Sequence, residues 1–125
     1  ALQRAQIVKG WIDANGNTQE AVFDVACAGG AAVNAETQRC PENNALVDVA
    51  TCATQADTGA DELRAVWRDP TYVAGESAAY YARALENPTC RWSSWDALRA
   101  GSSPNPTLPA IIQERVWSSP IWLEN

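Results

Sequence analysis

Large aliphatic side chains are scarce in this sequence. Leu, Ile, Val and Phe make up about 18% of its 125 residues, near the level at which chains remain disordered. Much of the 46% hydrophobic content comes from 23 alanines, which are too small to fill a core alone. Six Trp and three Tyr compensate, because each aromatic ring buries on the order of 150–250 Å². The composition therefore predicts one small domain in which most of the tryptophans lie in the core.

Cysteines offer a second source of stability. An even number of them, in a small acidic domain, is typical of disulfides formed in an oxidising compartment, so we expect a periplasmic or extracellular location. Free buried thiols and a zinc site are the alternatives. No Cys-x2-Cys pair occurs and the chain has no histidine, which disfavours zinc. The four positions are Cys27, Cys40, Cys52 and Cys90.

The first part of the chain predicts a β-hairpin. Residues 6–13 and 19–27 are rich in strand-forming side chains. Asn15-Gly16 between them predicts a type I′ turn, whose two central residues both take positive φ. A calcium loop is the alternative interpretation of residues 13–17, but the spacing of an EF-hand loop is absent. Proline and glycine content predicts loops at 28–45 and 101–109.

Three later segments also predict strands. Short alternating or β-rich runs cover residues 46–51, 62–69 and 111–123. Pro120 cannot donate a hydrogen bond to a neighbouring strand, so it predicts an edge, a bulge or a break.

Residues 76–87 are ambiguous. Their alanine content favours a helix that ends before Pro88, whereas a strand would place Tyr81 and Arg83 on one face. Residues 94–100 predict a short helix with Ser93 or Ser94 as N-cap and Gly101 after its end.

This outline predicts the disulfide pairing. If strands 21–27 and 46–51 are antiparallel neighbours, Cys27 and Cys40 meet at one end of the sheet. Cys52 leaves at the other end, where the returning chain brings Cys90. We therefore expect the pairs Cys27–Cys40 and Cys52–Cys90.

Several functional classes are disfavoured by composition. Without histidine there is no imidazole base and no Ser-His-Asp site, and phosphate-binding glycine motifs do not occur. A net charge of −6 disfavours nucleic acid and anionic membranes as partners. No apolar run is long enough to insert into a membrane. Fifteen acidic residues could include a catalytic pair, but an acidic solvated surface is the more ordinary role. We predict no cofactor and no catalytic residue.

The candidate binding residues are aromatic and basic. Trp92 and Trp95 flank a loop and could form an exposed aromatic pair. Arg83, Arg91 and Arg115 could hold a carboxylate or phosphate, although pairing with the excess acids is the more ordinary role.

Four strings occur in an order that resembles a known family. They are RAQIVKGW (4–11), ELRAVWRDP (62–70), YYARALENPTCRW (80–92) and IQERVWSSPIW (112–122). Together they resemble the C-terminal portion of the bacterial domain-of-unknown-function family number 3604. The ending also looks like the tail of PHP-type (polymerase and histidinol phosphatase) proteins. The resemblance implies that residues 80–87 form a strand. It also implies a longer parent whose metal ligands lie on an upstream barrel.

The sequence thus predicts a mostly β fold. We expect a small antiparallel β-sandwich-like domain, stapled by disulfides, with one short helix and long loops. Residues 1–125, which do not begin with Met, would form a single C-terminal domain of a larger secreted protein. Its predicted role is non-catalytic and accessory, covering the barrel of a metal-dependent hydrolase. The alternatives are an aromatic surface that binds glycans or a protein, and a self-contained carboxylate enzyme.

Overall fold

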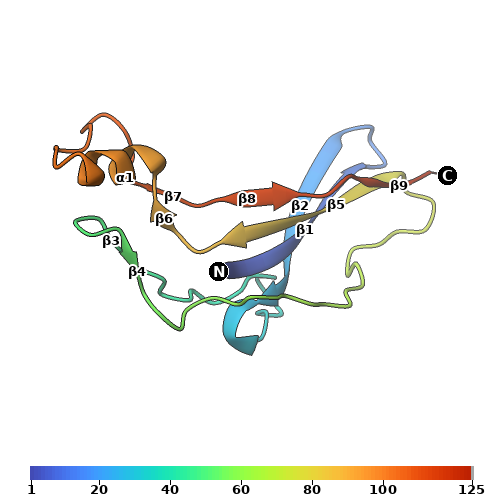
Figure 1. The fold of residues 1–125 in the computed structure, drawn as a ribbon. Coiled ribbons are helices and arrows are strands. Elements are labelled where there is room, and N and C mark those ends of the chain that lie inside the picture. The colour runs from blue at the N-terminus through green and yellow to red at the C-terminus, as the bar shows by residue number, and fades with distance from the viewer. Residues whose placement is uncertain (125) are drawn as a thin grey trace.

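The computed structural model describes residues 1–124, and its largest element is a five-stranded antiparallel sheet (Figure 1). The strand order is β2-β1-β5-β8, and β9 also pairs with β5. These strands are β1 (Leu2–Ile12), β2 (Thr18–Cys27), β5 (Ala78–Glu86), β8 (Arg115–Trp117) and β9 (Ile121–Leu123). The mostly β, antiparallel and disulfide-stapled fold class is confirmed.

Smaller elements surround the main sheet. Two short ribbons pair β3 (Val47–Asp48) with β4 (Ala53–Thr54), and β6 (Thr89–Cys90) with β7 (Ile111–Ile112). A 3-10 turn, η1 (Ala28–Gly30), follows β2, and the helix α1 (Trp92–Arg99) follows β6. Figure 1 shows α1 and the β3–β4 ribbon at one end of the molecule, with β9 at the other end. No helix among residues 1–124 has the length and apolar character needed to cross a membrane.

The β1–β2 hairpin is confirmed, but its turn is not type I′. The amide of Gly16 donates to the Asp13 carbonyl at 2.9 Å, and the amide of Asp13 donates to the Asn17 carbonyl at 2.9 Å. Gly16 takes φ +82° whereas Asn15 does not take positive φ. The connection is therefore a three-residue loop closed by a glycine bulge, which Asp13 holds by accepting the amides of Asn15 and Asn17 at 2.9 Å each.

Within the ambiguous stretch 76–87, residues 78–86 form the strand β5, so the helix that propensity favours is wrong here. β5 pairs with β1 along nearly its whole length, for example Tyr81 with Val8 and Arg83 with Gln6. Cross-strand pairing on both edges of β5 outweighs the small helix preference of its alanines. The strand that the family resemblance implies for residues 80–87 is confirmed within β5.

The C-terminal strand is interrupted at Pro120. Ser118 still pairs with β5, because its amide donates to the Ala82 carbonyl at 2.9 Å and its Oγ accepts the Ala82 amide at 2.9 Å. The register then resumes with Ile121 opposite Tyr80, one residue later than regular pairing would give. The predicted strand 111–123 thus becomes β7, β8 and β9, and of the edge, bulge or break predicted at Pro120 the structure has a bulge between β8 and β9.

Both predicted disulfides are confirmed. Cys27 bonds to Cys40 and Cys52 bonds to Cys90, and no free cysteine occurs in the described chain. The strand pairing used to predict them is wrong, however. Of residues 46–51 only Val47–Asp48 form a strand, and they pair with Ala53–Thr54 rather than with β2. The Cys27–Cys40 bridge instead ties the loop after β2 to the end of that strand, and the Cys52–Cys90 bridge joins the turn between β3 and β4 to β6 of the other short ribbon.

Residues 62–69 do not form the predicted strand. Together with residues 70–76 they make an extended segment without regular secondary structure, here called the crossing segment (62–76), which packs over one face of the main sheet. Its alternation still has a structural cause, because Trp67 lies against Phe23 with ring centroids 5.1 Å apart. The ring packs on the sheet while the backbone remains outside it.

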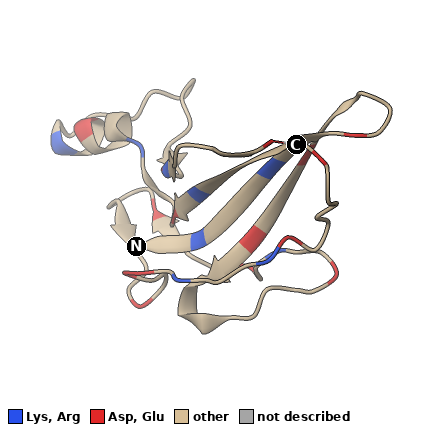
Figure 2. Cartoon of the chain, turned by 90° about the vertical axis from the view of Figure 1, so that its right-hand side faces the viewer, with Lys and Arg blue, Asp and Glu red and all other residues tan. Residues whose placement is uncertain are grey.

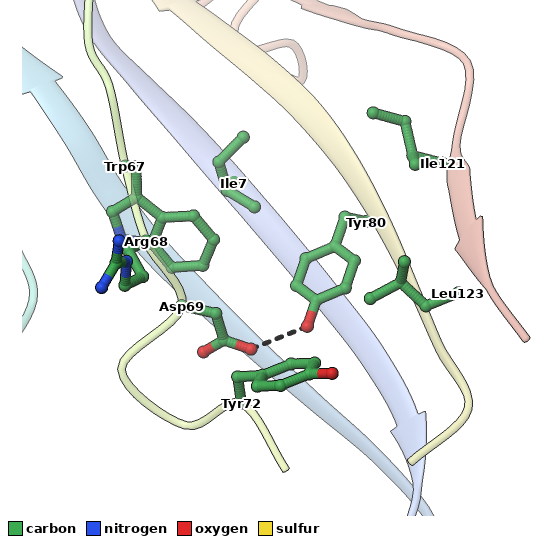
Figure 3. A pocket seen from close by; sticks show the side chains of 8 residues that line it. All are labelled: Ile7, Trp67, Arg68, Asp69, Tyr72, Tyr80, Ile121 and Leu123. Atoms are coloured by element: carbon green, nitrogen blue, oxygen red, sulfur yellow. Dashed lines mark hydrogen bonds between the residues drawn. The ribbon is translucent and has the colours of Figure 1, made fainter. Parts of the chain in front are cut away.

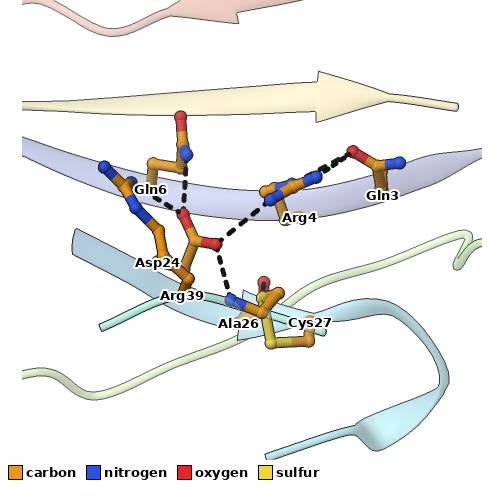
Figure 4. The surroundings of a disulfide bond; sticks show 8 residues. Gln3, Arg4, Gln6, Asp24, Ala26, Cys27 and Arg39 are labelled. Atoms are coloured by element: carbon orange, nitrogen blue, oxygen red, sulfur yellow. Dashed lines mark hydrogen bonds and ion pairs between the residues drawn. A yellow bond between two sulfur atoms is a disulfide. The ribbon is translucent and has the colours of Figure 1, made fainter. Parts of the chain in front are cut away.

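A buried aspartate fastens loop 28–45 beside the first disulfide (Figure 4). Asp24 is 1% exposed and accepts hydrogen bonds from Gln6 Nε2 at 2.6 Å and from the Cys40 amide at 2.7 Å. Arg4 and Arg39 approach the same carboxylate at 3.4 and 3.5 Å. Every oxygen of this buried charge is therefore paired, as a buried carboxylate requires.

Helix α1 begins two residues earlier than predicted. Arg91 occupies its N-cap position without a side-chain cap, and Ser94 Oγ donates instead to the Ala110 carbonyl at 2.9 Å. Gly101 takes φ +63°, and the Ser102 amide donates to the Ala97 carbonyl at 2.9 Å. This arrangement is a Schellman motif, which confirms the predicted glycine after the helix.

Candidate functional site

A pocket of about 700 Å³ lies between the crossing segment and the edge strand β9 (Figure 3). Ile7 and Tyr80 belong to adjacent strands and form its floor, and the crossing segment contributes Trp67. The Trp67 and Tyr80 rings meet nearly edge to face, with centroids 6.5 Å apart. The complete lining is Ile7, Trp67, Arg68, Asp69, Tyr72, Tyr80, Ile121 and Leu123. Its size and mainly apolar lining are typical of small-molecule sites.

The pocket forms because alternate residues of each strand face the same way. Ile7 pairs with Phe23, and Lys9 pairs with Tyr80, so all four side chains lie on the face that the crossing segment covers. Ile121 pairs with Tyr80 across the edge and joins that face. Along the crossing segment, Trp67 and Asp69 contact the sheet, and Arg68 between them lies at the rim beside Trp67 (Figure 3).

Lys9 fixes the crossing segment to the sheet. Its side chain is 1% exposed, and its Nζ lies 2.9 Å from Asp69 and 3.0 Å from Glu76. The ammonium also donates to the Thr71 carbonyl at 3.2 Å and lies 4.8 Å from the centroid of Trp11. Burial alone would lower the pKa of Lys9, but hydrogen bonds to the two carboxylates outweigh it and raise the pKa.

Asp69 is fully engaged at the base of the pocket. Tyr80 donates its hydroxyl to Oδ2 at 2.7 Å, and the Thr71 amide and hydroxyl donate to Oδ1 at 2.7 and 2.8 Å. Burial raises the pKa of Asp69, but the hydrogen bonds from Tyr80, Lys9 and Thr71 prevail and lower it to about 2. Burial and the neighbouring Asp69 carboxylate raise the pKa of Tyr80. Asp69 is therefore a structural anion near pH 7, with no lone pair aimed at an incoming ligand.

Two polar groups of the pocket remain free. No hydrogen bond or ion pair joins the Arg68 guanidinium to another described residue, and the same holds for the Tyr72 hydroxyl. Tyr72 is 58% exposed. The pocket thus offers an apolar bowl with one uncommitted cation at its rim.

The predicted binding residues lie elsewhere. Trp92 and Trp95 are on α1, and both are exposed, as expected for an exposed pair. Arg99 lies over the Trp95 ring at 5.5 Å. None of the five candidates lines the pocket described above. The structure does not gather them at one place either: Trp92 and Trp95 are on α1 and Arg91 is its N-cap residue, whereas Arg83 is on β5 and Arg115 on β8.

The three arginine candidates have different surroundings. Arg83 donates its Nε to Gln6 Oε1 at 2.7 Å, on the face away from the crossing segment. Arg91 has a buried Nε without a hydrogen-bond partner among the described residues. Arg115 is exposed on β8 opposite Leu85. Figure 2 shows acidic residues on several loops and on a strand, and basic residues at scattered positions on strands, loops and α1.

Most tryptophans do not fill the core, contrary to the prediction. Trp92 and Trp122 are each 67% exposed, Trp117 is 54% exposed and Trp95 is 37% exposed. Only Trp11 and Trp67 lie against the sheet in half-buried positions. Composition cannot separate a ring that fills the interior from a ring on a free face, because both require the same side chain.

One row of rings lies on the sheet face opposite the crossing segment. Trp117 pairs with Arg83, and Trp122 pairs with Ala79. Tyr81 lies between these two positions of β5 and on the same face, because it is two residues from each. We call Tyr81, Trp117 and Trp122 the aromatic row.

A metal centre has no basis in the described residues. No group of three or more His, Cys, Asp or Glu is arranged to hold an ion among residues 1–124. All four cysteine sulfurs are in disulfides, so the zinc alternative is wrong.

No sequence pattern predicts the pocket, because its lining comes from four distant segments. The one signal in the sequence is the alternating run 62–69, which contains Trp67. Tyr72 and Leu123 carried no pattern of their own.

Comparison with known proteins gives one match. The model of a protein family described as Protein of unknown function (DUF3604) matches residues 1–125. No curated protein and no solved structure matches the chain.

Proposed function

The chain belongs to the DUF3604 family, and from that premise we propose that it is a non-catalytic accessory domain of a larger PHP-like, metal-dependent hydrolase. In this proposal the aromatic row docks on the upstream barrel of the same protein. The observation that carries it is the exposure of Trp117 and Trp122, at 54% and 67%, on a sheet face. Large rings are seldom left in water in a row unless another surface covers them.

The size of the aromatic row favours a partner within the same polypeptide. A separate stable interface uses about 20–30 residues a side, far more than three rings and their neighbours. A covalently joined domain needs less contact, because its effective concentration reaches the millimolar range. Burial of the exposed ring area would stabilise the contact by about 25 cal/mol per Å².

The hydrolase part of the proposal rests on the ending Trp117-Ser-Ser-Pro-Ile-Trp122, which looks like PHP-type tails. The same segment is β8, the bulge and β9, so the string that resembles those tails also carries two rings of the aromatic row. We propose a periplasmic or extracellular location, which two disulfides support.

The test compares the chain alone with the longer protein encoded by its gene. Hydrogen exchange measured by mass spectrometry should show residues 115–123 protected more strongly in the longer protein. Substitution of Trp117 and Trp122 by Ser should remove that extra protection, whereas Trp92→Ser, an equally exposed control on α1, should not. Equal protection in the two proteins, or a gene that encodes no upstream domain, would refute the proposal.

Trp92 and Trp95 support a second candidate, an aromatic surface for glycans or a protein partner. Trp92 is 67% exposed and its ring is open to stacking, whereas Trp95 is 37% exposed and Arg99 lies over its ring. If this candidate is right, titration with a glycan panel should change the indole NMR signals of Trp92 and Trp95. The signals of the aromatic row should not change.

A further inference from the structure

We propose that the pocket between the crossing segment and β9 binds a small organic acid, an apolar ring that carries a carboxylate. Its ring would occupy the bowl of Trp67, Tyr72 and Tyr80, and its carboxylate would extend past Trp67 to pair with Arg68 at the rim (Figure 3). This site lies on the sheet face opposite the aromatic row, so it does not depend on the docking proposed above.

The walls favour an apolar body. Three aromatic rings and the side chains of Ile7, Ile121 and Leu123 surround the pocket of about 700 Å³. A planar ring can lie against Tyr72, which is 58% exposed, and displace water from Ile121, which is 69% exposed.

The same walls disfavour a sugar. A pyranose carries several hydroxyl groups, and each one buried without a partner costs about 1–3 kcal/mol. The Asp69 carboxylate and the Tyr80 hydroxyl are already bonded to each other at 2.7 Å. Only the Tyr72 hydroxyl and Arg68 remain to serve the sugar, which is too few for its hydroxyl set.

The charges around the pocket favour an anionic ligand over a cationic one. Asp69 is neutralised by Lys9 at 2.9 Å, and the Glu76 carboxylate is held by the same ammonium at 3.0 Å, outside the pocket lining. Arg68 has no intramolecular partner among residues 1–124, and its planar guanidinium suits a bidentate carboxylate. An amine would meet an uncompensated cation at the same place.

The pocket is also held in shape before any ligand arrives. Tyr80 is fixed by Asp69, and Trp67 is fixed by its contact with Phe23 at 5.1 Å. Lys9 ties the crossing segment to the sheet, so ligand binding needs little further ordering of the side chains around the pocket.

The experiment uses phenylacetate and its neutral analogue phenylacetamide as probes, with the 125-residue chain. We expect phenylacetate to bind with a Kd of about a millimolar, as a fragment of its size does, and to shift the indole signal of Trp67 in NMR spectra. Phenylacetamide should bind at least about tenfold more weakly, because it lacks the charge that pairs with Arg68. Glucuronate, which keeps the carboxylate on a hydroxylated ring, should also bind more weakly.

Variants separate the Arg68 contact from general charge. Arg68→Gln should weaken phenylacetate binding about tenfold, and Tyr72→Ala should weaken it severalfold. Arg64→Gln is the matched control, since Arg64 lies on the same segment but does not line the pocket. Equal affinity for the acid and the amide, equal effects of the two arginine variants, tighter binding of glucuronate, or no shift of Trp67 would each overturn the proposal. All these variants alter exposed side chains, and circular dichroism verifies that each remains folded.

Discussion

The ammonium of Lys9 lies 2.9 Å from the carboxylate of Asp69, and the two side chains are 1% and 7% exposed. This pair joins β1 to the crossing segment across 60 positions of the chain. A charge pair so far from water is costly to break, because removal of one partner leaves the other buried and unpaired.

Asp69→Asn should therefore destabilise the protein by about 3 kcal/mol, since Lys9 would keep only Glu76 as an anionic partner. Urea unfolding followed by tryptophan fluorescence measures the loss. Glu62→Gln is the control, because Glu62 pairs with Arg64 at an exposed site and should leave the midpoint unchanged. Equal midpoints for the two variants would show that the buried pair contributes nothing.

Acid should weaken the folded state through the same carboxylate. The folded-state pKa of Asp69 is about 2, below the value near 3.9 of an unfolded aspartate. The contribution, about 2–3 kcal/mol, is complete above about pH 5 and is lost progressively as the pH falls to 2. Urea unfolding between pH 6 and pH 2 should show a steeper decline for the wild-type protein than for Asp69→Asn. Parallel declines would contradict the assignment, since the lowered pKa values of Asp13 and Asp48 are common to both proteins.

The two disulfides should differ in their contribution to stability. The Cys52–Cys90 bridge spans 38 positions and the Cys27–Cys40 bridge spans 13, so the longer loop restricts the unfolded chain more. Loop-closure entropy gives about 4 kcal/mol for the longer bridge and about 3 kcal/mol for the shorter one. Thermal unfolding of the variants Cys52→Ala/Cys90→Ala and Cys27→Ala/Cys40→Ala tests the order. The reverse order would show that native contacts, not loop length, dominate.

Gly59 should tolerate no side chain. It takes φ +94°, and an added Cβ would lie 2.6 Å from the Ala1 Cβ and 2.7 Å from Asn87 Nδ2. Gly59→Ala should cost at least about 2 kcal/mol through positive φ and the clash together. Gly101→Ala is the matched control, with φ +63° but open space, and should cost about 1 kcal/mol. Similar unfolding midpoints for the two variants would contradict the close packing around Gly59.

The strands of the hairpin could be predicted from local alternation, and the presence of disulfides could be predicted from the even number of cysteines. The pairing of Cys52 with Cys90 is correct, although the strand order from which it is predicted does not occur. More than one path of the chain can bring these two cysteines together. Strand β5 was ambiguous because alanine favours a helix weakly, and only pairing with β1 and β8 decides the matter. Such pairing is non-local, and no periodicity encodes it.

The candidate site was harder to predict than the fold. Trp67 showed a pattern, but Tyr72, Tyr80 and Leu123 reach the same pocket from three places in the chain. The aromatic residues that the sequence indicates as binding candidates, Trp92 and Trp95, lie on α1 instead. Identity of a side chain indicates what it can bind, whereas its neighbours depend on the tertiary fold.

The crossing segment has a practical consequence for limited proteolysis. Its first half lacks backbone pairing to any described strand, and Val66 is fully exposed, so trypsin should cut first after Arg64. Cys52 lies before that cut and Cys90 after it, so the two fragments stay joined by a covalent bridge. A nicked preparation would therefore migrate as intact protein on a non-reducing gel. It would separate into two bands only after the disulfides are reduced.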